Sequence, residues 1–289
     1  MALTPIRREA DLPGLRIVPT ASLVPHEEFD LQRSEPLVAR LRNESHLKNP
    51  PIVAPIEGED RYIVLDGTNR AMAMTVLAYP HIVVQVVDYE SPGLLLETWY
   101  HLVTEMPSAD FLFALRTVEG LMVEPTDLLH ARAELARRLA TAYVIMPPDR
   151  ADGHHTVYLL YAEGDLHRRT MLLNRLVHVY RMRGRIHRAN TDHIEHLVSY
   201  YPNVTALVVF PHYQASEIVE LARQGAYLPP GITRHIIPGR VLRINFPLEV
   251  LAEDRPIEEK NAWLQEWMKK KLAGKEIRYY QESTYLFDE

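Results

Sequence analysis

The most restrictive feature of this sequence is the stretch "YIVLDGTNRAMAM", in which an apolar run stops abruptly at an acid and a glycine. Residues 62–66 are typical of a short buried strand because Val, Ile and Leu dominate them. The alanines and methionines that follow, over 70–79, indicate a helix. A strand that passes directly into a helix through Asp66 and Gly67 predicts an α/β unit.

The surrounding sequence extends this unit to the first ninety residues. The stretch "PPIVAPI" before the turn and "HIVVQVVDYE" after the helix are further runs rich in Val and Ile, and each predicts a strand. Earlier, "LRIVP" predicts a strand and "SEPLVARLRNES" has the apolar spacing of a helix. A polar turn, "ESPG" at 90–93, closes the unit.

The second part of the chain also mixes helices and strands. We expect helices over 94–104, 108–119, 126–141 and 166–182 and near 190–200, and strands in "HTVYLLYAEG", "TALVVFP" and "RVLRINFPLEVL". The stretch "ASEIVELARQG" and the last apolar pattern, which contains Trp263, Leu264 and Trp267, predict two more helices. The fold class is therefore α/β (α+β), with a domain over 1–92 and a second over 93–289 that together form a cleft.

Composition narrows the classes of function. The chain of 289 residues is 47% hydrophobic and carries a net charge of −6, so it has no global attraction for a nucleic-acid backbone, and a nucleic-acid role would need a local basic patch. There is no cysteine, which excludes disulfides and thiolate chemistry. We expect a cytoplasmic protein without a membrane segment, because the N-terminal residues lack an apolar signal and no run is long enough to span a bilayer.

The turn from Asp66 to Arg70 is the first candidate site. The N–H groups of a helix N-terminus carry partial positive charge, Gly67 allows close approach, and Arg70 supplies a forked cation, so phosphate is the expected guest. The alternative is an ordinary Asp-Gly turn capped by Thr68 or Asn69, with a solvated arginine.

Two further clusters contain polar side chains that can act on a substrate. In "VPHEEFD", a carboxylate on a loop fixed by proline suits a general base or a metal ligand, although acidic loops are often merely solvated. In "PPGITRHIIPGR", Thr233, Arg234 and His235 offer donors for an anion. A strand would send Arg234 to the opposite face, so convergence of all three predicts a bent loop.

Aromatic and histidine residues give weaker signals. Trp99 and Tyr100 follow the expected domain boundary and suit packing or a ligand pocket. His193 and His196 lie three apart on an expected helix and form at most half of a metal site.

The order of these motifs resembles a known family. "LVPHEEF", "PPIVAPI" and "YIVLDGTNRAMAM" resemble a ParB/sulfiredoxin-like N-terminal domain with its D-G-x-x-R box. "PHE" at 25–27, "TWY" at 98–100 and "TRH" at 233–235 extend the resemblance to the free L-serine kinases, including the siderophore-biosynthesis and ADP-dependent members.

The resemblance implies phosphoryl transfer from ATP or ADP to free L-serine, giving O-phospho-L-serine, with magnesium. It implies that Glu27, rather than Glu28, is the base, and that Asp66 holds magnesium or the turn. Nucleotide phosphates would lie on Gly67, Thr68, Asn69, Arg70 and Lys48. Serine and the transferred phosphate would contact Trp99, Thr233, Arg234 and His235.

Several alternatives stay open at this stage. Some relatives carry two histidines where this chain has Thr68 and Asn69, which leaves the choice between ATP and ADP undecided. Haem regulates some kinases of this type, but no residue here matches a haem motif. A ParB-like DNA-binding or regulatory protein shares the box, and the basic stretch 166–188 would serve it, although its apolar spacing favours a packing helix. A non-enzymatic sensor would need the same pockets.

Overall fold

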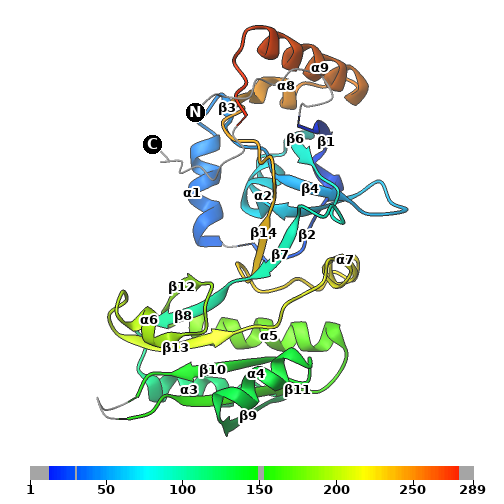
Figure 1. The fold of residues 1–289 in the computed structure, drawn as a ribbon. Coiled ribbons are helices and arrows are strands. Elements are labelled where there is room, and N and C mark those ends of the chain that lie inside the picture. The colour runs from blue at the N-terminus through cyan, green and yellow to red at the C-terminus, as the bar shows by residue number, and fades with distance from the viewer. Residues whose placement is uncertain (1–12, 30, 149–152, 280–289) are drawn as a thin grey trace. The chain divides into compact units, whose positions relative to one another are not determined.

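The computed structural model describes residues 13–29, 31–148 and 153–279 (Figure 1). These residues divide into two compact units. The first takes in the described residues of Met1–Pro25, Phe29–Leu94 and Ile237–Glu289, and the second consists of those of His26–Glu28 and Leu95–Ile236. Within the described ranges, no helix combines the length and apolar character that a bilayer crossing requires.

The first unit is built on a five-stranded mixed sheet with the strand order β1-β6-β4-β5-β2. Its strands are β1 (Leu15–Pro19), β2 (Leu23–Pro25), β4 (Ile52–Pro55), β5 (Tyr62–Asp66) and β6 (His81–Val86). The pairs β1·β6 and β4·β5 are antiparallel, whereas β2·β5 and β4·β6 are parallel. A short 3-10 turn, η2 (Thr20–Ser22), joins the first two strands, and β3 (His46–Leu47) pairs with β15 (Phe246–Pro247) outside the sheet.

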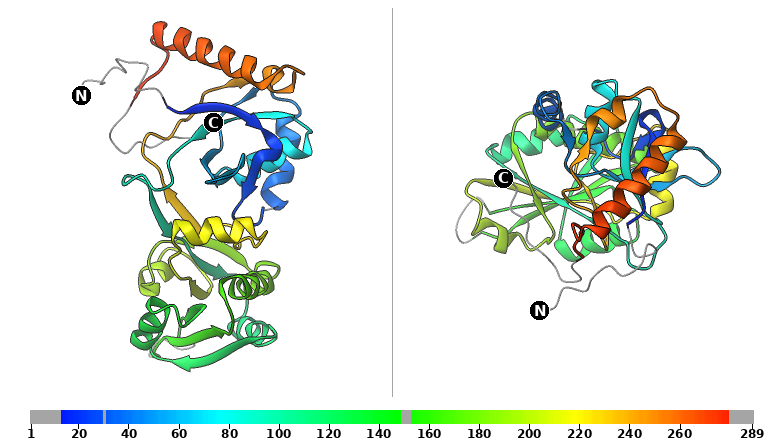
Figure 2. Two further views of the ribbon diagram at one scale, coloured as in Figure 1. Left: turned by 90° about the vertical axis from the view of Figure 1, so that its right-hand side faces the viewer. Right: turned by 90° about the horizontal axis from the view of Figure 1, so that it is seen from above.

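Four helices belong to the first unit: α1 (Leu31–Leu41), α2 (Thr68–Val76), α8 (Leu248–Ala252) and α9 (Ile257–Ala273). Figure 2 shows α9, in orange and red, beside the dark-blue strand β1. The Asn261 side chain fixes this contact, because it accepts from the N–H of Ile17 at 2.9 Å and donates to the Ile17 carbonyl at 2.8 Å.

The C-terminal segment therefore joins the first unit, which differs from the division at residue 92 expected from the sequence. Phe246, Leu251, Leu264 and Met268 share one buried cluster with apolar residues of β1 and β6, such as Ile17. Burial of this apolar surface holds the segment to the first unit. The sequence shows that the last helix has an apolar face but not which core that face covers.

The second unit contains a six-stranded antiparallel sheet with the order β12-β8-β13-β10-β11-β9. Its strands are β8 (Tyr100–Thr104), β9 (Leu121–Thr126), β10 (Ala142–Met146), β11 (Thr156–Ala162), β12 (Arg185–Ala189) and β13 (Val204–Val209). A separate two-stranded antiparallel sheet pairs β7 (Leu95–Thr98) with β14 (Thr233–Ile236).

Helices cover this sheet. They are α3 (Ser108–Arg116), α4 (Leu128–Ala136), α5 (Leu166–Arg181), α6 (Ile194–Val198) and α7 (Ala215–Arg223). Every residue of β10 is buried, so both faces of the sheet are covered at this strand. Tyr143 and Ile145 share a cluster with Ala131 of α4 and Ile194 of α6. The helix α5 buries its apolar residues, from Leu172 to Tyr180, as its spacing predicts.

Two expected elements differ from the structure. The helix expected over 94–104 is two strands, β7 and β8, and the β-branched and aromatic residues there, among them Thr98, Tyr100 and Val103, suit a strand. The strand expected over 240–251 is irregular up to Asn245. Arg243 and Asn245 have φ values of 53° and 46°, which lie outside the β region and interrupt an extended strand.

Candidate functional site

A carboxylate, Glu27, is the centre of the first cluster, which lies within the second unit. Backbone hydrogen bonds hold its segment beside Leu228: the N–H of Leu228 donates to the His26 carbonyl at 2.8 Å, and the N–H of Glu28 donates to the Leu228 carbonyl at 2.8 Å. This bridge of parallel type brings residues about two hundred positions away to Glu27.

The Glu27 carboxylate accepts three hydrogen bonds. Its Oε2 accepts from the N–H of Gly231 at 2.7 Å, and its Oε1 accepts from the N–H of Thr233 at 2.7 Å and from the Thr233 hydroxyl. The Glu27 side chain is 13% exposed. These donors fix the carboxylate in one orientation and leave it partly accessible.

Glycine is required at position 231. Its φ is +78°, and a Cβ there would lie 2.5 Å from Nη2 of Arg188. The positive φ is strained for any residue that has a side chain, and a larger residue would also displace the guanidinium group of Arg188.

Two buried histidines lie next to Thr233: His235 is on the same face of β14, and His26 comes from the segment that carries Glu27. Nε2 of His26 lies 2.7 Å from the Thr233 hydroxyl oxygen. The rings of His26 and His235 meet edge to face, with centroids 5.2 Å apart, and both side chains are buried.

Arg234 points away from this group. It forms an ion pair with Glu97 of β7 at 3.0 Å, and its guanidinium carbon lies 4.4 Å from the centre of the Trp99 ring. Because β14 is a strand, its residues alternate between two faces, and Thr233, Arg234 and His235 do not converge on one point as a bent loop would allow.

A fully buried histidine, His101, supports Gly231. Burial, together with the charges of Arg188 and Arg181, lowers the pKa of His101 to about 3, and a hydrogen bond to the Gly231 backbone opposes this. Nδ1 of His101 lies 2.8 Å from the Tyr180 hydroxyl. Since the N–H of Gly231 is donated to Glu27, its carbonyl is the atom that accepts from His101.

The second cluster lies within the first unit, where β5 ends at Asp66 and α2 begins. Gly67 is the N-cap of α2 with a φ of 91°, and no side chain caps the helix. The alternative in which Thr68 or Asn69 is the N-cap is therefore wrong, because both residues lie inside the helix. Because Gly67 has no side chain, the N-cap residue itself makes no hydrogen bond to the first turn of α2, and a helix N-terminus that begins at a glycine suits an anion.

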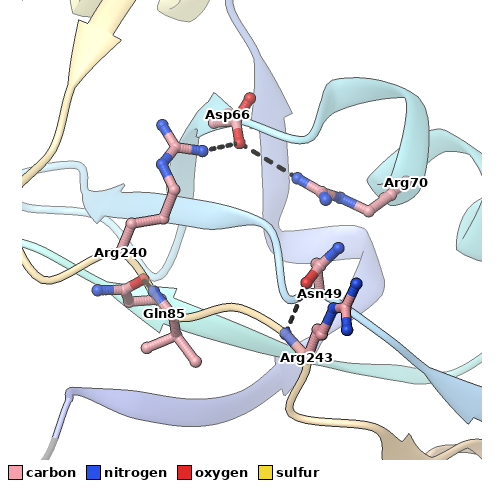
Figure 3. A network of polar contacts seen from close by, with 7 residues as sticks. Asn49, Asp66, Arg70, Gln85, Arg240 and Arg243 are labelled. Carbon is pink, nitrogen blue, oxygen red and sulfur yellow. Dashed lines mark hydrogen bonds and ion pairs between the residues drawn. The ribbon is translucent and has the colours of Figure 1, made fainter. Parts of the chain in front are cut away.

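Asp66 lies between two arginines (Figure 3). Its Oδ2 accepts from Nη2 of Arg70 at 3.2 Å and from Nη1 of Arg240. Burial alone would raise the pKa of the Asp66 carboxyl, but the positive charges of Arg70 and Arg240 hold that pKa below its usual value. Asp66 stays ionised and keeps the two guanidinium groups close together.

Arg240 is a cation of this cluster that no sequence motif predicted. Its loop is held by side chains instead of a strand: Gln85 donates to the Gly239 carbonyl at 3.0 Å and accepts from the N–H of Val241 at 2.9 Å. Asn49 accepts from the N–H of Arg243 at 2.7 Å (Figure 3). A buried glutamine within the apolar run "HIVVQVV" is the signal that could have indicated such a loop.

Lys48 belongs to the first unit and is exposed. Its Nζ lies 3.3 Å from Glu44. It lines an open hollow of about 610 Å³ together with Asn43, Glu44, Ser45, His46 and Asn245.

The histidine pair at 193 and 196 does not extend to a metal centre. The two rings stack with centroids 5.7 Å apart. Over the described residues, no three His, Asp or Glu side chains are grouped so that they could hold a metal ion.

Known proteins resemble this chain in sequence and in structure. No family model matches this chain. An ATP-dependent L-serine kinase of Staphylothermus marinus is 27% identical over 250 residues, which cover 81% of this chain and 90% of the relative. The ATP-dependent L-serine kinase SbnI of Staphylococcus aureus is 23% identical over 279 residues, covering 95% and 97%.

Solved structures agree with the fold. A free serine kinase in complex with AMP matches with a TM-score of 0.70 at 18% identity, over 86% of this chain and 95% of the other. SbnI of Staphylococcus aureus with a C-terminal truncation matches with a TM-score of 0.67 at 21% identity, over 89% and 97%. The α/β fold class and the resemblance to the free L-serine kinases are confirmed.

Proposed function

We infer that this chain is a free L-serine kinase, which transfers the terminal phosphoryl group of a nucleotide to the serine hydroxyl and yields O-phospho-L-serine. The observation that carries this proposal is the Glu27 carboxylate, oriented by two backbone N–H groups and one hydroxyl. The relatives that match along most of the chain are named L-serine kinases, which agrees with an alcohol as the acceptor.

The proposed chemistry uses Glu27 as the general base. The serine hydroxyl gives its proton to Glu27 while its oxygen bonds to the terminal phosphorus, and the bond from that phosphorus to the bridging oxygen breaks. The shortened nucleotide leaves with the electron pair of that bond. A carboxylate that is ionised at neutral pH can accept this proton.

The phosphates of the donor are proposed to bind the first unit at the start of α2. Gly67, Thr68, Asn69 and Arg70 supply backbone N–H groups and one cation, and Arg240 adds a second cation beside the first. Less evidence supports a phosphate contact at Lys48, because this lysine pairs with Glu44 on an exposed surface. We favour ATP as the donor over ADP because the relatives are named ATP-dependent.

Magnesium neutralises phosphate charge in reactions of this kind. Asp66 does not fit as its direct ligand, because Oδ2 of Asp66 already accepts from two guanidinium groups that would repel a divalent cation. We propose that magnesium binds to the nucleotide phosphates, and that Asp66 holds Arg70 and Arg240 in position.

The amino-acid end of serine is proposed to bind near β14. Arg234, stacked on Trp99, suits the serine carboxylate, since a guanidinium group matches the geometry of a carboxylate. His235 is the proposed contact for the transferred phosphate. Thr233, in contrast, donates its hydroxyl hydrogen to Glu27.

The proposal is tested by incubating the protein with serine, magnesium and either ATP or ADP, and by measuring phosphoserine by mass spectrometry. We expect phosphoserine with ATP. Threonine and homoserine in parallel reactions define the acceptor pocket, because one extra methyl or methylene group is discriminated by about 10- to 200-fold. Absence of phosphoserine with both nucleotides would refute the proposal.

A further inference from the structure

The two oxygens of Glu27 have different environments. Oε1 accepts two hydrogen bonds, both from Thr233, whereas Oε2 accepts one, from the N–H of Gly231. A carboxylate oxygen has two lone pairs in the plane of the group. Oε1 is therefore saturated, and Oε2 retains a lone pair that can receive a proton.

The hydrogen-bond directions around Thr233 follow from the charge on Glu27. An ionised carboxylate only accepts, so the Thr233 hydroxyl hydrogen points to Oε1. The hydroxyl oxygen can then only accept from His26, whose Nε2 lies 2.7 Å away. This requires a proton on Nε2 of His26 and sets the direction from His26 through Thr233 to Glu27.

We propose that His26 and Thr233 are positioning residues for Glu27: they orient its carboxylate through Oε1 and leave Oε2 as the atom that receives the serine proton. This inference rests on the proposed function of Glu27 as the base. It assigns the Thr233 hydroxyl to the protein itself instead of to the substrate.

Neighbouring residues hold the hydrogen bonds between His26, Thr233 and Glu27 in place. His26 is 2% exposed and His235 is 7% exposed, and their edge-to-face contact limits rotation of the His26 ring. On the other side, a hydrogen bond from His101 holds the backbone at Gly231, which donates to Oε2.

The test compares Thr233→Val, which removes the hydroxyl, with Thr233→Ser, which retains it. For Thr233→Val we expect kcat to fall roughly 10- to 100-fold, the effect of losing one hydrogen bond to a charged group, while KM for serine changes less than about threefold. Thr233→Ser should restore kcat.

A second pair of variants tests His26. His26→Gln can still donate a hydrogen bond to Thr233 and His26→Leu cannot, so His26→Leu should show the larger loss of kcat. Thermal unfolding and calorimetric titration with ATP confirm that each variant is folded. A rise in KM for serine with unchanged kcat in Thr233→Val would overturn the inference, because it would place the hydroxyl on the substrate.

One measurement is independent of activity. In the ¹⁵N NMR spectrum of the whole protein, His26 should carry a proton on Nε2 that exchanges slowly with water and exchanges faster in Thr233→Val. An Nε2 of His26 without a proton would overturn the hydrogen-bond direction. If the proton is present but the wild type forms no phosphoserine, the proposed function fails and the hydrogen-bond chain stands.

Discussion

The two candidate clusters hold charge in opposite ways. In the second unit, a single carboxylate is fixed mainly by backbone N–H groups and lies in a mostly buried site. In the first unit, one carboxylate holds two arginine side chains, and Asp66 and Arg240 keep 40% and 34% of their side-chain surface exposed. The first arrangement orients an anion, and the second gathers cations.

This difference matches the two tasks of phosphoryl transfer. A base must meet one hydroxyl hydrogen in a defined direction, and a small misplacement greatly reduces the rate. A polyphosphate has many equivalent oxygens, so side chains on a partly exposed surface suffice to bind it. We therefore expect substitutions in the Glu27 cluster to change mainly kcat, and those in the Asp66 cluster to change mainly nucleotide affinity.

The largest effect is expected for Glu27→Gln. Loss of the base should reduce kcat by about 100- to 10,000-fold, the usual contribution of general base catalysis. Steady-state phosphoserine formation measures this, and titration with ATP should show nearly unchanged affinity. Normal turnover by this variant would show that the fixed carboxylate is not the base.

The second prediction concerns acid stability. The pKa of His101 is about 3 in the folded chain and 6.5 when exposed. Below pH 6.5 the unfolded chain binds a proton that the native chain does not, so stability falls as the pH decreases towards 3. At about 1.4 kcal/mol for each pH unit, the full loss is roughly 5 kcal/mol.

The Asp66 cluster should lose its stabilising ion pairs in a lower pH range than the His101 site. The pKa of Asp66 lies below its usual 3.8, so its pairing with the arginines is kept above pH 3.8 and lost only under stronger acid. Hydrogen exchange at pH 7 and pH 4.5 should show that the backbone around Gly231 loses protection at a higher pH than the turn at Asp66.

His101→Gln should flatten the pH dependence of Tm. This variant separates the contribution of His101 to acid unfolding from those of His81 and His187, because burial also lowers the pKa values of these two histidines.

The sequence predicts the parts of this comparison that depend on local pattern. The strand, glycine turn and helix around Asp66 are present as expected, because the Val and Ile run and the left-handed Gly67 are local signals. The helices α5 and α9 also match their apolar spacing. These elements are specified by residues close together in the chain.

Other parts depend on long-range pairing. No local pattern indicates that Glu27 binds the N–H groups of Gly231 and Thr233, 204 and 206 positions away. The strand β14 places Thr233 and Arg234 on opposite faces. The position of Arg240 depends on the Gln85 side chain, which forms hydrogen bonds to the backbone on both sides of Arg240. The family resemblance identified most of the candidate residues, and their roles stay predictions.

The third prediction tests whether Arg70 and Arg240 bind the nucleotide phosphates. Arg240→Gln should weaken ATP binding about 10- to 100-fold, because it removes one charged hydrogen-bond donor next to Arg70. The value of kcat at saturating ATP should change much less. Arg42→Gln, which removes an exposed arginine of the same unit, is the matched control and should have no effect. Isothermal titration with ATP measures both variants.

Arg240→Gln could instead reduce kcat at saturating ATP and leave ATP affinity unchanged. This result would contradict the assignment of nucleotide binding to the Asp66 cluster and catalysis to the Glu27 cluster.

Asp66→Asn tests the same cluster through its carboxylate. It should weaken ATP binding because both arginines lose their anchor, yet leave the magnesium dependence unchanged. A shifted magnesium requirement would instead identify Asp66 as a metal ligand.

The smallest effect is expected at Trp99, on the opposite face of β14 from Glu27. Trp99→Leu removes the ring below Arg234, a contact worth about 0.5–2 kcal/mol, and should raise KM for serine about 2- to 30-fold. Trp99→Phe retains an aromatic face and should have a smaller effect. Because Arg234 keeps its ion pair with Glu97, kcat should fall little in either variant. If both variants lose kcat as strongly as Thr233→Val, the two faces of β14 act on the same step, and their assignment to separate tasks is wrong.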